Sequence, residues 1–152
     1  MVTFDALDLY RDMACSRQWR GFLRALGAEF ESALPPQELD RLMARVGERF
    51  ADAHPLPAVP TLEALEQGCN QIWRELGWGQ VVFVETEVAV EIQHVGSPLA
   101  SAFGQASAWP QGFLLGVYRR WMRSAGMLPG LDVRLVTGGT EDVLLYRLAR
   151  VA

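Results

Sequence analysis

The amino-acid sequence predicts a single α+β domain of four to five helices and two antiparallel hairpins. Three observations lead to this fold class. Apolar residues recur at helical spacing over most of the first 76 positions and again over residues 109–124. Two other regions alternate apolar residues around turn residues, which is typical of hairpins. Hydrophobic residues make up 50% of the 152 positions, so the chain can bury one substantial core.

Helices account for the first half of the predicted fold. A short helix is expected over residues 4–13, and an amphipathic helix follows Ser16. Pro35-Pro36 ends that helix and begins the next, because proline is tolerated at the first helical position. The proline-rich run 55–60 is expected to be an extended linker. The stripes of the two longer helices are Trp19, Phe22, Leu23, Leu26, Phe30 and Ala33, and Leu39, Leu42, Met43, Val46 and Phe50.

The junction after residue 76 is the most informative local feature of the chain. Thr61 is expected to cap a helix that ends at Gly77. Gly77 and Gly79 supply left-handed backbone without steric cost, and a strand follows from Val81. Trp78 lies between the two glycines, where its ring either packs back across the junction or stays exposed.

Strands and one more helix complete the prediction. In the first hairpin, one face is expected to carry Val88, Val90, Ile92 and His94. Residues 99–108 are expected to form a loop of small residues, and a helix should run from about Trp109 to Ser124. Two further strands, near 131–136 and 143–151, should be joined through Gly138-Gly139.

Composition excludes several classes of function. A net charge of −4 and a pI near 5.2 argue against nucleic-acid binding, which needs clustered positive charge. The N-terminus lacks the basic and apolar segments of a signal peptide, and no stretch approaches the roughly 20 apolar residues of a membrane span. A cytoplasmic location is therefore expected.

Residues that could carry catalysis lack the partners that catalysis requires. Cys15 and Cys69 have neither metal-ligand spacing nor an evident activating base, and each is expected to be a small buried hydrophobe. The carboxylates near the first hairpin, among them Glu85 and Glu91, fit the exposed face of an antiparallel sheet better than a glycosidase pair. His94 continues an apolar row and is expected to be a hydrogen-bonded structural histidine. No catalytic residue, metal or cofactor is predicted.

The tryptophans are treated in the same way. Trp19, Trp73 and Trp121 lie on apolar helix stripes, so core or an oligomer interface is expected for them, although aromatic faces also stack on sugar rings. Trp109 stands at a helix start before proline and is less clearly buried.

Taken together, the order and spacing of these residues resemble the D subunit of bacterial cellulose synthase. The resemblance covers most of the chain from about Phe22 and is strongest between Pro55 and Gly126. The linker departs from it by having Ala58-Val59 where a cysteine is expected, and both the N-terminus and the 99–108 region look different. The residues that carry the resemblance are Asn70, Gly77, Trp78, Gly79, His94, Pro98, Trp109, Gly116, Val117, Tyr118, Arg119, Arg120 and Trp121.

The resemblance implies an accessory subunit without activity of its own. Such a protein forms a cylindrical homo-octamer, a tetramer of dimers, whose passages guide glucan chains toward crystalline cellulose. N-terminal segments line the passages in part, which here implies Val2, Thr3 and Phe4. The implied partners are a proline-rich accessory protein and the membrane-embedded synthase, at the cytoplasmic side of the inner membrane or in the periplasm. Synthase activity itself is not implied, because Arg120-Trp121 lacks the glutamine of the Gln-x-x-Arg-Trp motif, having Val117 instead.

The residues also favour self-association independently of the resemblance. More large apolar side chains are present than one domain easily hides, and Phe4, Tyr10, Trp109 and Met127 are expected to belong to this surplus. Two alternatives remain open: a small acidic dimeric chaperone for a secreted or membrane client, and an unrecognised glycosidase using Glu85 or Glu91.

Overall fold

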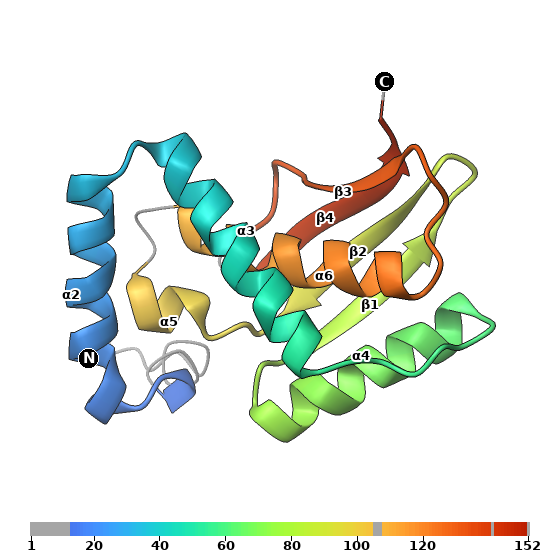
Figure 1. Ribbon diagram of the computed structural model, residues 1–152. Helices are drawn as coiled ribbons and strands as arrows, with labels where there is room; N and C mark the ends of the chain where they lie inside the picture. Colours follow the sequence, from blue (N-terminus) through green and yellow to red (C-terminus); the bar gives the residue numbers. More distant parts are fainter. Residues whose placement is uncertain (1–12, 105–107, 141, 152) are drawn as a thin grey trace, which may run out of the picture.

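The computed structural model describes residues 13–104, 108–140 and 142–151, and Figure 1 shows their arrangement. The predicted helix over 4–13 and the residues Val2, Thr3, Phe4 and Tyr10 lie outside this described part. The elements are α2 (Arg17–Ala33), α3 (Pro36–Ala53), α4 (Leu62–Leu76), β1 (Gln80–Glu85), β2 (Ala89–Val95), α5 (Leu99–Phe103), the 3₁₀ turn η1 (Trp109–Gln111), α6 (Gly112–Ser124), β3 (Leu131–Leu135) and β4 (Val143–Arg150).

Local chemistry sets the ends of the helices. The Ser16 hydroxyl accepts the N–H of Gln18 at the start of α2, and the Thr61 hydroxyl accepts the N–H of Ala64 at the start of α4. Pro36 opens α3 in the position where its missing N–H is harmless. Gly77 ends α4 with a left-handed φ of 71°. The predicted cap at Thr61, the helix end at Gly77 and the proline boundary are therefore confirmed, and the cap at Ser16 is an addition from the structure.

The strands form one four-stranded antiparallel sheet in the order β1-β2-β4-β3. The two predicted hairpins are present, and they are joined edge to edge because β2 pairs with β4, with Val95 opposite Val143. The predicted α+β class with two antiparallel hairpins is thus confirmed, and the pairing of β2 with β4 adds the link that makes them one sheet.

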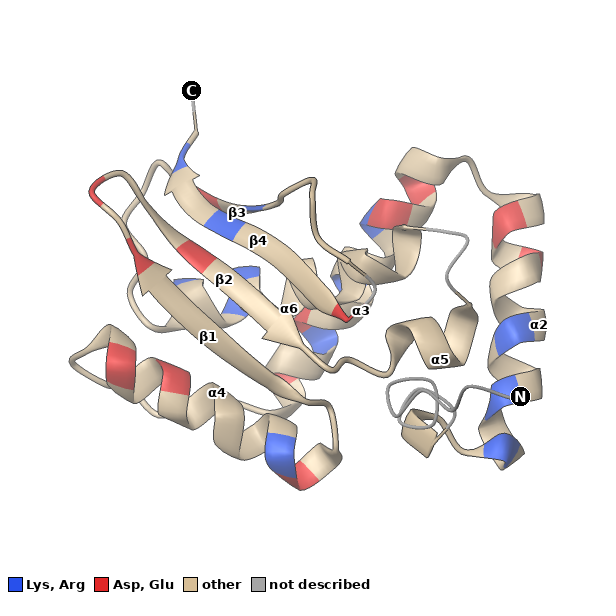
Figure 2. Cartoon of the chain, turned by 180° about the vertical axis from the view of Figure 1, so that it is seen from behind, with Lys and Arg blue, Asp and Glu red and all other residues tan. Residues whose placement is uncertain are grey.

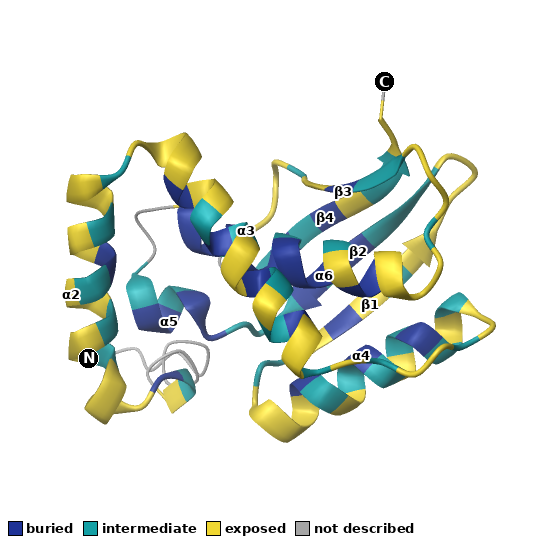
Figure 3. Ribbon diagram, in the orientation of Figure 1, coloured by how far each residue is buried: buried dark blue, intermediate teal, exposed yellow. Residues whose placement is uncertain are grey.

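Helices cover only one face of this sheet. In Figure 1, α6 lies on the sheet, α3 crosses over α6, and α2 stands apart at the far side of α5. Figure 2 shows the opposite face of the sheet with no described helix over it. The buried residues, dark blue in Figure 3, accordingly gather between the sheet and the helices α3, α4 and α6.

Two sequence predictions fail around α5. The loop expected over 99–108 contains the helix α5, in which Leu99, Ser101 and Ala102 are buried. Its small residues pack beneath α2 instead of marking a flexible connection. Trp109 begins a 3₁₀ turn and is only 7% exposed, so α6 starts at Gly112 and Trp109 does not belong to an exposed surplus.

Two other apolar residues also differ from expectation. Met127, assigned to the surplus, is half-buried against the core. Val88, predicted to share the inner face of the hairpin, lies in the turn before β2 and is 84% exposed. On the same face, Ile92 and His94 are buried and Val90 is half-buried.

Glycines allow α3 and α6 to cross in backbone contact. A Cβ atom at Gly116 would lie 1.9 Å from the carbonyl oxygen of Ala44, and one at Gly47 would lie 2.0 Å from that of Phe113. Real side chains never approach backbone so closely, so any other residue would force the helices apart. Gly116, one of the residues that carry the resemblance, is therefore explained by packing.

Gly116→Ala should destabilise the fold by about 2 kcal/mol or more, because separating the helices outweighs the better helix propensity of alanine. The matched control is Gly21→Ala, also within a helix, where the added Cβ meets nothing within 4 Å. The control should be neutral or slightly stabilising, since alanine is the better helix former. Urea denaturation measures both, and equal unfolding free energies for the two variants would contradict the close crossing.

Candidate functional site

The residues singled out by the sequence converge on a buried aromatic cluster. Trp73 comes from α4, His94 from β2 and Tyr118 from α6, and all three are fully buried. Trp78, from the junction between α4 and β1, stacks on Trp73 with ring centroids 5.7 Å apart. Trp121 packs on the same ring of Trp73 at 5.2 Å. The cluster thus joins α4, β2, α6 and the junction between α4 and β1.

The polar atoms of the cluster form a chain of hydrogen bonds in which each donor and each acceptor can be assigned. The Nε1–H of Trp73 donates to the Tyr118 hydroxyl at 3.1 Å, and His94 Nδ1 lies against the same hydroxyl. His94 Nε2 lies 2.7 Å from the carbonyl oxygen of Trp78, which can only accept, so Nε2 carries the ring proton. Nδ1 then accepts the proton of the Tyr118 hydroxyl. The predicted structural histidine is confirmed.

Burial shifts the ionisation of these groups toward their neutral forms. Desolvation lowers the pKa of His94 to about 4, although its hydrogen bond to the Trp78 carbonyl opposes this shift. Desolvation likewise raises the pKa of Tyr118 well above its usual value. Cys69 is buried nearby, and desolvation raises its pKa to about 12. Such a thiol remains protonated and unreactive near neutral pH, which argues against its use as a nucleophile.

The two glycines of the junction have different roles. A Cβ at Gly77 would meet no atom within 4 Å, so only its left-handed φ requires glycine. At Gly79, φ is 80° and a Cβ would also lie 2.0 Å from the carbonyl oxygen of Val95. Together they turn the chain so that Trp78 folds back over Trp73. The question that the sequence left open for Trp78 is therefore answered: its ring is half-buried and packs inward.

Side chains close the two outer edges of the sheet. Along β1, the Asn70 amide accepts the N–H of Val81 at 2.7 Å and donates to its carbonyl at 2.8 Å, while Glu66 accepts the N–H of Phe83 at 2.7 Å. On β3, Arg119 binds the carboxylate of Asp132 and the carbonyl of Val133. Because these edge groups are satisfied within the chain, they do not offer a ready place for strand addition.

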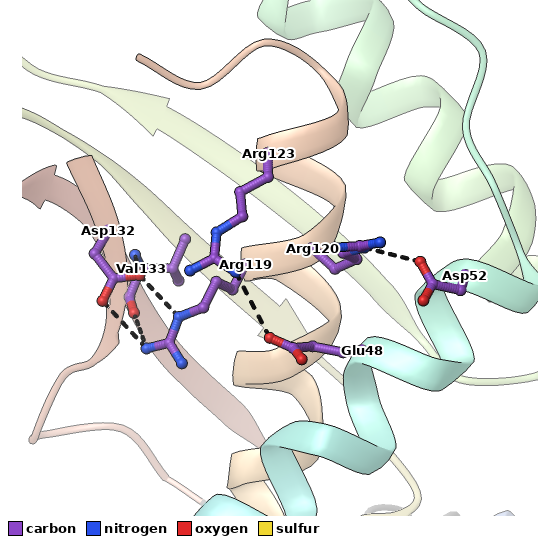
Figure 4. A network of polar contacts seen from close by, with 7 residues as sticks. All are labelled: Glu48, Asp52, Arg119, Arg120, Arg123, Asp132 and Val133. Carbon is purple, nitrogen blue, oxygen red and sulfur yellow. Dashed lines mark hydrogen bonds and ion pairs between the residues drawn. The ribbon is translucent and has the colours of Figure 1, made fainter. Parts of the chain in front are cut away.

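Ion pairs link α6 to α3 at the surface (Figure 4). Arg120 lies 2.8 Å from Asp52, and Arg123 lies 3.8 Å from Glu48. The Arg120 pair is about half-exposed on both sides, so its contribution to stability is small. Arg120, one of the residues that carry the resemblance, therefore acts here as a surface link between helices.

The described residues offer little that resembles a catalytic centre. Glu91 is held by Arg147 at 2.7 Å across neighbouring strands, which is the ordinary cross-strand pairing of an exposed sheet face. Across residues 13–104, 108–140 and 142–151, no cluster of His, Cys, Asp or Glu side chains could hold a metal ion. None of the helices in this described part is long and apolar enough to cross a bilayer.

Exposed apolar residues form the most conspicuous feature of the surface. In α2, only Gly27 is buried, while Trp19 is 55% and Phe22 57% exposed and their rings pack edge to face. Between α2, α3 and α5 lies a cavity of about 240 Å³ with a wholly apolar lining. Leu23, Met43, Val46, Trp78, Leu99 and Phe113 contribute to this lining. The described surface around α2 is thus apolar both at the exposed aromatic pair and in the cavity.

Comparison with known families decides the relationship. The sequence model of the cellulose synthase D subunit matches residues 5–148, nearly the whole chain. The chain belongs to the cellulose synthase D subunit family. No curated protein matches it. Members of this family are accessory subunits, which act in the cellulose synthase complex without being its catalytic component, and the complex is associated with the inner membrane.

Sequence reasoning missed part of the site of this cellulose synthase accessory protein. It named Asn70 and Arg119 without a role, and it did not single out Glu66, although all three close sheet edges. The spacing of Asn70 and Glu66, four residues apart on a helix directly before a strand, was the only available signal. No pattern in the sequence indicated the apolar cavity, because residues from α2, α3, α5 and the Trp78 junction come together there only in the folded chain.

The burial of His94 predicts a pH-dependent stability. The unfolded chain takes up a proton on His94 below about pH 6.5, whereas the folded chain does so only near pH 4. The free energy of unfolding should therefore be constant above pH 6.5 and fall as the pH drops toward 4. Between pH 7.5 and 5 the loss should be about 2 kcal/mol.

The measurement is urea denaturation of the wild type and His94→Gln at several pH values. The wild type should lose about 2 kcal/mol more than the variant over this range, because glutamine does not titrate. His54 is present in both proteins, so its contribution cancels. Parallel pH profiles for the two proteins would contradict a neutral, desolvated His94.

Proposed function

We propose that this accessory protein is a non-catalytic scaffold that assembles into a closed homo-octamer, a tetramer of dimers, and guides glucan chains toward crystalline cellulose. The exposed apolar surface of α2 is the observation that carries the assembly. A helix with Trp19 and Phe22 more than half exposed is costly in water unless a partner covers it. Membership in an accessory-subunit family supports the link to cellulose.

Contact between α2 helices of two copies would account for this surface. The Trp19–Phe22 pair supplies the aromatic anchor that stable interfaces place at their centre. Strand addition is a poor alternative, since side chains already satisfy groups along both edges of the sheet. We therefore assign α2 to the dimer contact. In the proposed dimer, the α2 helices of the two copies meet across a two-fold axis.

The remaining roles follow the family. Val2, Thr3 and Phe4 would line the inner passage, outside the described residues. The proline-rich accessory protein and the membrane-embedded synthase would be partners at the cytoplasmic side of the inner membrane, with the periplasm as the alternative location. Because the apolar cavity offers no polar group for glucan hydroxyls, the passage and not the cavity is the proposed route of the glucan.

Native mass tests the dimer contact. Light scattering or native mass spectrometry should give an octamer for the wild type and a much smaller species for Trp19→Glu/Phe22→Glu, because buried unpaired charges oppose association. Ala28→Glu places a charge at another exposed position of the same helix and should leave the octamer intact. A wild-type monomer would overturn the scaffold, and a wild-type dimer would favour a chaperone for a protein client. An octamer that survives the double substitution would remove α2 from the contact.

A second experiment tests the inner passage. Deleting residues 2–4 should lower the crystalline fraction of cellulose made by cells while the octamer mass stays unchanged, because the passage and not the assembly is altered. Diffraction or solid-state NMR of the cellulose measures the crystalline fraction. Unchanged crystallinity with an intact octamer would contradict a guiding role for these residues.

A further inference from the structure

The turn between β1 and β2 carries exposed acidic residues, and hydrogen bonds within the turn fix its shape. We call residues 85–88 the acidic turn, since Glu85 and Glu87 are exposed there beside Val88, which is 84% exposed. Thr86 fixes its shape: the N–H of Thr86 donates to the carbonyl of Ala89 at 2.8 Å, and the Thr86 hydroxyl accepts the N–H of Ala89 at 3.1 Å. A turn held in this way loses little conformational freedom on binding.

The surroundings of the acidic turn add to its negative charge. Figure 2 shows the acidic residues at the start of α4, at the end of β1 and in the turn gathered at one end of the molecule. Glu63 belongs to this group as the acidic residue in the first turn of α4. No arginine or lysine occurs between Glu75 and Arg119 in the sequence. On the neighbouring strand β4, Arg147 pairs with Glu91 and Arg150 follows the partner of Ala89, so the negative charge of this end belongs to the turn and the start of α4.

A basic surface of matching size lies on α3. Arg41, Arg45 and Arg49 follow one another at four-residue spacing, so they form one row on the exposed side of the helix, which we call the basic row. In the described part of the chain, none of these three side chains has an ion-pair or hydrogen-bond partner. Of the four acidic residues of the same helix, Glu48 and Asp52 are engaged by α6 (Figure 4), while Glu38 and Asp40 lie in the first turns of the helix. The charge of the row is thus available to a second molecule.

An apolar surface adjoins the basic row. Val46 follows Arg45, is 41% exposed, and contributes to the lining of the apolar cavity between α2, α3 and α5. The row and the cavity mouth thus combine positive charge with an apolar recess. The acidic turn combines negative charge with one protruding apolar side chain, Val88. The two surfaces are complementary in charge, and each presents an exposed apolar side chain.

We propose that the acidic turn of one copy of this chain docks on the basic row of another, with Val88 against Val46 at the mouth of the cavity. The contact is heterologous, because it joins two different surfaces of the same chain, and repetition of such contacts closes a ring or extends a filament. A tetramer of dimers can be closed by a contact of this kind in addition to a two-fold one. The inference therefore rests on the proposed self-association and names the second interface within it.

Charge reversal tests the contact without touching the core. Arg45→Glu/Arg49→Glu places like charges against the acidic turn, and Glu85→Arg/Glu87→Arg places like charges against the basic row. Each variant alone should associate at least about a hundredfold more weakly than the wild type, because juxtaposed like charges are strongly unfavourable. Native mass spectrometry should then show the ring replaced by dimers. Arg74→Glu/Arg134→Glu makes the same change of net charge as the first variant, at other positions, and should leave the ring intact.

Mixing the two reversed variants supplies the decisive result. Each then carries the charge that the other needs at both surfaces, so the mixture should regain the wild-type mass, with the two variants alternating. Failure of either variant to dissociate, or failure of the mixture to reassemble, overturns the contact. A wild-type protein that does not form a ring refutes the proposed octamer instead, whereas a wild-type ring unaffected by charge reversal refutes only this interface.

Discussion

The structure depends on the requirement that the polar atoms buried with Trp73 and Tyr118 have partners. Three rings from α4, β2 and α6 bring an indole N–H, a hydroxyl and an imidazole together out of contact with water, where an unsatisfied group costs about 1–3 kcal/mol. The last atom that needs a partner, His94 Nε2, finds it in the backbone of Trp78. The backbone of the junction between α4 and β1 must therefore be positioned as precisely as the side chains of the core.

This placement has consequences for both sides of the domain. With α4 fixed beside β1, Asn70 and Glu66 reach the edge of the sheet and satisfy groups that would otherwise pair with another chain. On the other side, glycines at the α3–α6 crossing let the two helices lie close enough to cover one sheet face with few residues. Because α3 and α6 cover this face, α2 has a single buried residue and an apolar cavity lies beside it. Stability is concentrated in the core, and the surfaces available for assembly lie at its periphery.

The scaffold role proposed above would need this division. A scaffold has to keep its shape while its contacts form and break, so the residues that hold the fold and those that meet other copies are best separated. Here His94, Tyr118 and Asn70 belong to the first group, and the proposed contact surfaces, which are Trp19, the acidic turn and the basic row, belong to the second. The residues that carry the family resemblance fall mostly in the first group, which explains why they identify the family without revealing its contacts.

The sequence by itself determined the elements and the class of the fold. Helical periodicity, the cap at Thr61, the proline boundary and the Gly77-Trp78-Gly79 junction are local signals, and local signals suffice to place helix ends and strands. Only the tertiary structure decided that β2 pairs with β4, that Trp109 is buried and that residues 99–103 form a helix. It also decided what Asn70 binds and where the apolar cavity lies, because these depend on contacts between residues distant in sequence, whose free energy no local pattern records.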